Sequence, residues 1–176
     1  MTNIQACELP LNAMLRKYKD GAGYADCYIT EVPSFITQTA FIEAFYTTPL
    51  FKLERTLLKY LASKPATDAD AKQLALGNTN TFSAWRVESR SASELLLADF
   101  TGGTRSWLMT VASIDARTGA PSTLLYFGSA VVARRRSSDG QLRMGWILHA
   151  LLGFHRVYSR LLLKAASRRV RKTPSA

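Results

Sequence analysis

The middle of the chain consists of extended segments joined by very short turns. Four such segments follow one another, at residues 82–88, 94–100, 105–114 and 122–133. The turns between them are rich in glycine and serine, as in Gly102-Gly103. Short links join neighbouring antiparallel strands, because a parallel pair needs a crossover of about a dozen residues or more. The sequence therefore predicts a four-stranded antiparallel meander, and this constrains the fold more than any other feature.

A fifth strand and two helices are predicted upstream of the meander. Residues 24–32 alternate between two sets of side chains, and Pro33 ends the segment. Helical periodicity follows at residues 37–46 and again at 49–63, where Pro49 occupies the first turn. The first strand is therefore followed by two helices in tandem.

Three further helices are indicated by capping signals and apolar spacing. A short one spans residues 67–76, with acidic side chains in its first turn and a glycine after its end. A long one, about 40 Å, spans residues 142–170 near the C-terminus. A weak amphipathic helix is predicted at residues 11–18.

The length and composition fit one domain. The chain has 176 residues, of which 47% are hydrophobic and 20% are charged. We expect an N-terminal extension at residues 1–23, a core at 24–170 and a frayed basic tail at 171–176. The combined pattern is an α+β fold.

The compartment is predicted from the cysteines and the N-terminus. Cys7 and Cys27 lack a CxxC spacing and are interpreted as two reduced thiols. The N-terminal residues lack the charged and apolar regions of a signal peptide, and no stretch is apolar enough to span a bilayer. A cytoplasmic protein is expected.

Six short stretches resemble an uncharacterised bacterial branch of the START-like superfamily, also called SRPBCC or polyketide-cyclase-like. They are YADC at 24–27, EAFYTTP at 43–49, WRVE at 85–88, RSWL at 105–108, YFGS at 126–129 and LLGFHR at 151–156. The resemblance implies a helix-grip fold, in which an antiparallel sheet wraps around the long C-terminal helix and encloses a cavity. It also implies a preference for apolar or amphipathic ligands. Such sheets have six or seven strands, whereas five are counted here, so we expect five to seven. Either one of the predicted strands is really a hairpin of two, or the grip is more open.

Three aromatic side chains on different strands could line such a cavity. Trp85, Trp107 and Tyr126 would suit a flat or apolar ligand if all three point inward. The alternative is that they are ordinary core aromatics. Because the strands are apolar on both sides, both faces of the sheet must be covered, one by the long helix or a cavity. The other would meet the helical pair or a second subunit, which suggests a homodimer.

Three polar residues complete the predicted ligand pocket. Asp99 and Arg105 flank a short turn and would form an ion pair or anchor a polar group of the ligand. His155 lies near the apolar side of the long helix, where it would face the cavity or hydrogen-bond within the core. His149 lies about 120° away around the helix, which disfavours a metal pair.

No catalytic, phosphate-binding or metal-binding motif is present in the sequence. No catalytic residues, cofactor or metal are therefore assigned, and a binding protein is favoured over an enzyme. The alternative is a cavity enzyme of cyclase or hydratase type, with Asp99, Arg105, Tyr126 or His155 as acid-base groups. That alternative requires two of them to meet around open space.

The positive charge is concentrated at the C-terminus. The net charge is +10, yet residues 1–133 contain twelve basic and twelve acidic side chains. Four basic residues recur at four-residue spacing on the long helix: Arg156, Arg160, Lys164 and Arg168. This surface would be a solvated helix face or would contact an anionic membrane. Nucleic acid is the least favoured partner, because no base-reading motif accompanies the charge.

These observations favour a binding protein for a hydrophobic or aromatic small molecule or lipid. The ligand would lie between the sheet and the C-terminal helix.

Overall fold

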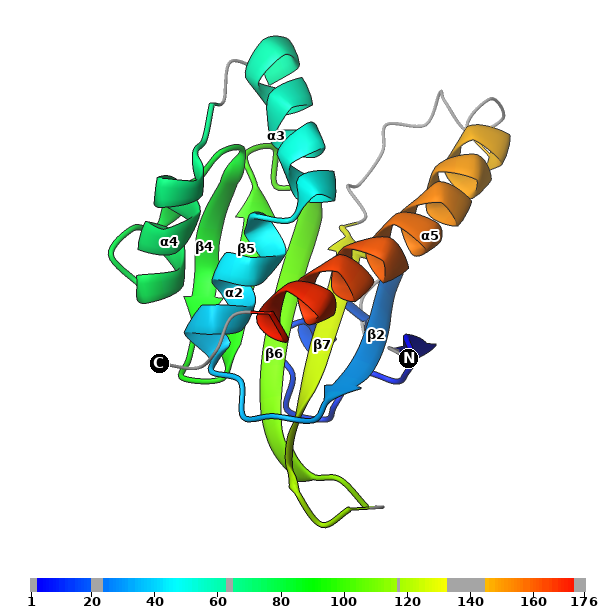
Figure 1. Ribbon diagram of the computed structural model, residues 1–176. Coiled ribbons are helices and arrows are strands. Elements are labelled where there is room, and N and C mark those ends of the chain that lie inside the picture. Colours follow the sequence, from blue (N-terminus) through cyan, green and yellow to red (C-terminus); the bar gives the residue numbers. More distant parts are fainter. Residues whose placement is uncertain (1–2, 20–23, 63–64, 117, 133–144, 173–176) are drawn as a thin grey trace.

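An antiparallel sheet forms the centre of the fold, with helices α2 to α5 gathered on one of its faces (Figure 1). The computed structural model describes residues 3–19, 24–62, 65–116, 118–132 and 145–172. Across those ranges the sheet has seven strands in the order β1-β2-β7-β6-β5-β4-β3. The strands are β1 (Gln5–Ala6), β2 (Tyr24–Val32), β3 (Thr81–Phe82), β4 (Trp85–Arg90), β5 (Glu94–Asp99), β6 (Thr104–Ile114) and β7 (Pro121–Val131). The predicted α+β class and antiparallel meander are confirmed.

Two strands were absent from the sequence prediction. The segment predicted as one strand at 82–88 is a hairpin, in which Thr81 pairs with Arg86 and Phe82 with Trp85. Ser83 makes this turn with a positive φ of 52°. The other addition is β1, which pairs with the middle of β2 at one edge of the sheet. The sheet therefore has seven strands within the described ranges, the upper end of the expected five to seven, and the merged-hairpin alternative is correct.

The helices follow the prediction closely after the first strand. They are α1 (Arg16–Lys19), α2 (Gln38–Tyr46), α3 (Pro49–Ala62), α4 (Asp68–Leu76) and α5 (Gly145–Val170). Thr67 and Asp70 form a reciprocal capping box at the start of α4, and Gly77 ends that helix with φ 83°. The prediction for residues 11–18 was wrong in extent, because the only helix there, α1, has four residues and starts at Arg16.

An aromatic core fills the space between the sheet and the helices, on the face that we call the helical face. The rings of Phe45 and Phe127 lie 4.7 Å apart between centroids, and Tyr46 lies 4.9 Å from Phe51 and 5.3 Å from Phe82. Strands alternate their side chains between two faces. Phe127 and Leu125, which point to the same face of β7, both belong to this core.

The opposite face, which we call the N-terminal face, is covered by the start of the chain. Leu9, Ala13 and Leu15 pack against Leu96 and Trp107 in a second apolar cluster. The prediction that the helical pair covers this face was wrong, because α2 and α3 share the helical face with α5. Part of the predicted N-terminal extension therefore belongs to the core. The expectation of a homodimer rested on an uncovered face of the sheet, and the N-terminal segment covers that face.

Helix α5 packs with a set of side chains that only partly matches the sequence prediction. The apolar spacing predicts a buried stripe through Tyr158, Leu161, Leu162 and Ala165, and of these only Leu162 is among the buried positions of the helix. These buried positions are Ser159, Leu162, Leu163, Ala166, Ser167 and Val170. Ser159 and Ser167 are completely buried, whereas Leu161 is exposed. No helix among the described residues has the length and apolar character to cross a bilayer.

Candidate functional site

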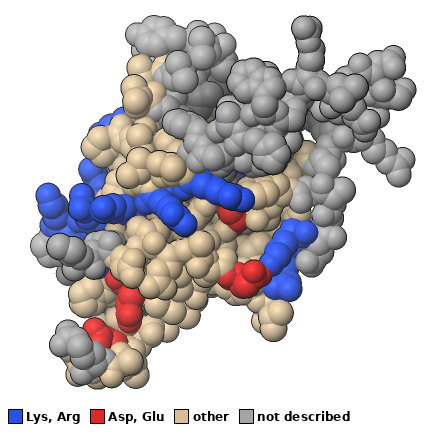
Figure 2. Space-filling model, turned by 90° about the vertical axis from the view of Figure 1, so that its right-hand side faces the viewer, with Lys and Arg blue, Asp and Glu red and all other residues tan. Residues whose placement is uncertain are grey.

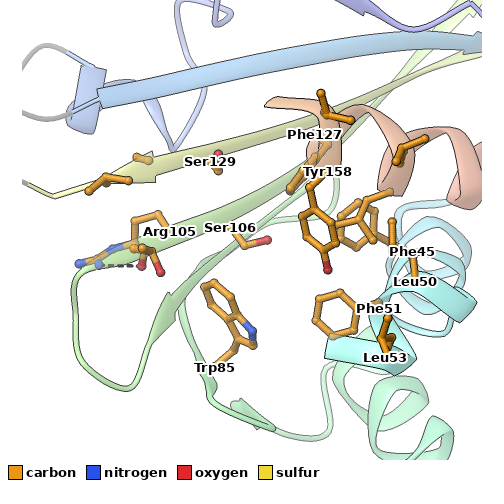
Figure 3. Close-up of a pocket in the computed structure, with 16 residues that line it drawn as sticks. Phe45, Leu50, Phe51, Leu53, Trp85, Arg105, Ser106, Phe127, Ser129 and Tyr158 are labelled. Carbon is orange, nitrogen blue, oxygen red and sulfur yellow. Dashed lines mark hydrogen bonds between the residues drawn. The ribbon is translucent and has the colours of Figure 1, made fainter. Parts of the chain in front are cut away.

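A cavity of about 660 Å³ lies between the sheet and helices α3 and α5 (Figure 3). Helices α3 and α5 diverge in Figure 1. Both helices contribute side chains to the cavity lining, as do strands β4, β6 and β7. The described residues that line it are Phe45, Leu50, Phe51, Leu53, Trp85, Thr104, Arg105, Ser106, Phe127, Ser129, Ala130, Val131, Val157, Tyr158, Leu161 and Leu162. A cavity was predicted between sheet and C-terminal helix, and one is found there.

The cavity has an apolar wall and an apolar rim. Its inner wall contains Phe45 and Phe127, whose rings are in contact. At the rim, Leu53 of α3 is 68% exposed, while Val157 and Leu161 of α5 are 58% and 49% exposed. Val157 and Leu161 are four residues apart, so they lie on the same side of α5. Exposed apolar side chains on two facing helices are typical of the entrance to a binding site for apolar molecules.

Few polar groups face the cavity. The Ser106 hydroxyl lies 3.3 Å from that of Tyr46, and the Ser129 hydroxyl donates to Asp26 at 2.6 Å. The indole Nε1 of Trp85 is buried and has no acceptor among the described atoms. In Figure 3 the Tyr158 hydroxyl and the Trp85 indole lie on either side of the same space. The site can therefore offer a hydrogen-bond donor to a ligand that is otherwise apolar.

Of the three predicted pocket aromatics, only Trp85 lines the cavity. Trp107 and Tyr126 lie on the N-terminal face, with ring centroids 6.2 Å apart, in the cluster covered by Leu15. The Trp107 indole donates to the Glu94 carboxylate at 2.7 Å. The prediction for these two residues was wrong, because the alternation of a strand shows which residues share a face but not which face is hollow.

The predicted ion pair between Asp99 and Arg105 is also wrong. Arg105 Nε donates to the Glu88 carboxylate at 2.5 Å and to the Tyr18 hydroxyl at 3.0 Å. Asp99 accepts from the hydroxyl of Thr101 and the backbone N–H of Thr104, and so organises its own turn. Arg105 borders the cavity, but its charge is satisfied on the N-terminal face.

Glu88 is the centre of this charged cluster. Burial acts to raise the pKa of its carboxyl group, but hydrogen bonds from Lys17 and Tyr18 and the charge of Arg105 outweigh burial, so the pKa is lowered. Glu88 reaches the cluster from a β-bulge, since the pairing with β5 shifts between Val87 and Ser89. The cluster fixes the N-terminal segment to the sheet beside the cavity.

We expect Glu88→Gln to lower the free energy of unfolding by about 1–3 kcal/mol at neutral pH, because it leaves a half-buried arginine without its counter-ion. A lowered native pKa stabilises the fold above the unfolded-state pKa, and this contribution is lost as pH falls through the native pKa. Urea denaturation should therefore show a gap between wild type and variant at pH 7 that narrows towards pH 3. The exposed Glu8, paired with Lys19, is the control, and Glu8→Gln should change little. An equal gap at both pH values would contradict this role for the Glu88 charge.

The remaining acid-base candidates do not meet in the cavity. Tyr126 lies on the other face, and Asp99 and Arg105 have the separate partners given above. His155 belongs to α5, but its side chain lies outside those described. In the described part of the chain, no group of three His, Cys, Asp or Glu side chains could hold a metal ion. The acid-base candidates whose side chains are described are therefore dispersed over the two faces of the sheet.

The basic surface of α5 runs beside β2. Figure 2 shows Lys and Arg side chains as a band across this side of the molecule, with acidic side chains close to it. Arg156 Nε donates to the Tyr24 hydroxyl at 3.0 Å, and Arg160 lies over the Tyr28 ring at 5.4 Å. Arg168 is exposed and Lys164 is half-buried. Two of the four predicted basic residues therefore also hold α5 against the aromatic side chains of β2.

Comparison with protein-family models and with curated proteins finds no match for this chain.

Proposed function

We propose that the chain is a helix-grip protein of the START-like group that binds one hydrophobic or aromatic small molecule or lipid without catalysing a reaction. The apolar cavity of about 660 Å³ between sheet and C-terminal helix carries this proposal. The seven-stranded antiparallel sheet and the position of α5 over β2 and β7 support the same grouping.

The size and walls of the cavity support a ligand of moderate size. Sites for small molecules are typically about 300–1,000 Å³ and mostly apolar, with a few polar groups that fix orientation. Removing apolar surface from water contributes about 25 cal/mol per Å², so contact with rings such as Phe45, Phe51 and Phe127 would supply most of the affinity. A charged ligand would lose its hydration on entering this cavity. The described lining residues offer no unpaired group of opposite charge to compensate for that loss.

The ligand also needs a hydrogen-bond acceptor. Trp85 Nε1 is a buried donor at the cavity wall, and a carbonyl, ether or hydroxyl oxygen could accept from it. A mostly apolar molecule with one such oxygen fits the lining better than a pure hydrocarbon, because the indole donor would then be paired.

The two alternatives receive weaker support. A cyclase or hydratase would need acid-base groups that meet in the cavity, and the described candidates are dispersed. Attachment to an anionic membrane would use the basic band, but Arg156 and Arg160 already contact Tyr24 and Tyr28. Binding in the cavity is the function with a specific geometric basis.

The rim residue Leu161 provides a test that leaves the fold intact. We expect Leu161→Glu to weaken binding of the neutral apolar fluorophore N-phenyl-1-naphthylamine by about tenfold or more, since it replaces apolar contact with a charge at the entrance. Ile114 is 69% exposed at the end of β6 and does not line the cavity, so Ile114→Glu is the matched control. Fluorescence titration should show wild-type affinity for this control. Equal affinity in both variants would place the probe elsewhere and count against the proposal.

A further inference from the structure

The only two cysteines of the chain lie side by side. Cys7 and Cys27 are 20 residues apart in sequence, yet their sulfur atoms are 3.2 Å apart. Strand β1 pairs Ala6 with Tyr28, and the next residue, Cys7, donates its backbone N–H to the carbonyl oxygen of Cys27 at 3.0 Å. The sequence predicted two reduced thiols but not their proximity, because a strand of two residues gives no periodic signal.

The backbone is already placed for a disulfide. Residues directly opposite each other in antiparallel strands have Cα atoms about 4.5–5.5 Å apart, which lies within the range of about 4.4–6.8 Å that a disulfide requires. The sulfur atoms need to approach by only about 1 Å to reach a bonding distance near 2.05 Å. Side-chain rotation can supply this movement, and the two hydrogen-bonded strands need not separate.

The two thiols differ in access. Cys27 is 4% exposed and packs in the cluster of Trp107 and Leu15, whereas Cys7 is half-buried at its margin. An oxidant from solvent would therefore reach Cys7 first, and Cys27 would react with the modified Cys7.

We propose that Cys7 and Cys27 form a dithiol site that a hydroperoxide oxidises to an intramolecular disulfide. The Cys7 thiolate attacks one peroxide oxygen and becomes a sulfenic acid, while the O–O bond breaks and the other oxygen leaves as water or an alcohol. The Cys27 sulfur then attacks the Cys7 sulfur, forming the S–S bond and releasing the sulfenic oxygen as water. Together the two thiols lose two electrons and two protons, and the two oxygen atoms of the peroxide take up these electrons and protons.

The local hydrogen bond supports this order. Hydrogen bonding with Cys27 lowers the pKa of the Cys7 thiol, against the opposing effect of burial. The same hydrogen bond and burial raise the pKa of Cys27. Since the thiolate is the nucleophile, Cys7 is the better first reactant.

The disulfide would fasten the N-terminal segment to the sheet. Residues just beyond Cys7 include Leu9, Ala13 and Leu15, which cover the N-terminal face. A cross-link between β1 and β2 restricts the unfolded chain and would make this cover harder to detach. The site is separate from the proposed ligand cavity, so it does not depend on that function.

Treatment of the full-length reduced protein with hydrogen peroxide tests the proposal. We expect the intact mass to fall by about 2 Da, both thiols to become unreactive after denaturation, and dithiothreitol to reverse the change. Thermal unfolding of the oxidised protein should shift upward by about 5 °C.

Two single variants separate the roles of the thiols. Cys27→Ala should stop at a Cys7 sulfenic acid that dimedone traps, and Cys7→Ser should leave the buried Cys27 unmodified. The proposal would be overturned if wild-type Cys7 accumulated sulfinic or sulfonic acid while Cys27 stayed a thiol. Disulfide-linked dimers as the sole oxidised product, or no reaction of either thiol, would overturn it as well.

Discussion

Phe45→Ala is expected to lower the free energy of unfolding by about 3–5 kcal/mol, the loss typical of truncating a buried aromatic residue. Phe45 is 1% exposed, and its ring lies 6.1 Å from that of Phe41, 5.2 Å from Tyr46 and 4.7 Å from Phe127. The contact with Phe127 joins α2 to the sheet. Because Phe45 also lines the ligand cavity, the variant should enlarge that cavity as well as loosen the core.

Urea denaturation, with the melting temperature as a second readout, checks this effect. A melting temperature lowered by on the order of 10 °C is expected for a domain of this size. Phe100 is 59% exposed in the turn after β5, so Phe100→Ala is a matched control with a small expected cost. Similar losses for the two variants would show that Phe45 is not the core residue described here.

Gly128→Ala is expected to be the most damaging single-methyl addition in β7, at about 2–4 kcal/mol. A Cβ at this position would lie 2.7 Å from Leu15 Cδ2, 2.8 Å from the backbone oxygen of Asp26 and 3.0 Å from Trp107 Cε3. The leucine side chain can move, but the Asp26 oxygen belongs to the paired strand β2. The N-terminal segment is therefore packed against a position that only glycine fits.

The double variant Leu15→Ala with Gly128→Ala, compared with Leu15→Ala alone, distinguishes the two causes. Gly128→Ala should cost nearly as much in the Leu15→Ala background as in the wild type, because the backbone contact with Asp26 remains. Gly103→Ala is the control, since its nearest contact is the Thr101 hydroxyl at 3.2 Å and its φ is not positive. A harmless Gly128→Ala in chemical denaturation would contradict the close approach of the N-terminal segment to β7.

The sequence predicted the longer helices and strands well, but it predicted poorly which elements and side chains pack against one another. The predicted strand at 24–32 and the tandem helices around Pro49 correspond closely to β2, α2 and α3. Each of these elements is long enough for its periodic pattern to repeat, or has a strong capping signal. Strands of two residues, such as β1 and β3, have no period to detect. They were missed for that reason, and with β1 the proximity of Cys7 and Cys27 was missed too.

The site was predicted in position but only partly in composition. Trp85 and Arg105 do border the cavity, whereas Trp107 faces away from it. Both faces of the sheet are apolar, so composition could not show which face carries the helices. The bulge at Glu88 also has no sequence signature, although it supplies the partner of Arg105.

The rim of the cavity was the least visible part. Leu53 and Leu161 are leucines in regular helical patterns, and such residues are expected in the core. Their exposure results from the divergence of α3 and α5, which is a property of the tertiary structure. The rim could have been recognised from the apolar stripe of α5 if that stripe had been seen to be wider than one buried helix face, because the surplus apolar residues must then be exposed.

Native mass spectrometry of the purified protein after incubation with a bacterial lipid extract tests the central claim most directly. The account predicts one adduct of a mostly apolar small molecule per chain, with the adduct strongly reduced for Leu161→Glu and retained for Ile114→Glu. The absence of any adduct in the wild-type spectrum, or an adduct equally abundant in Leu161→Glu, would contradict a ligand site between the sheet and α5.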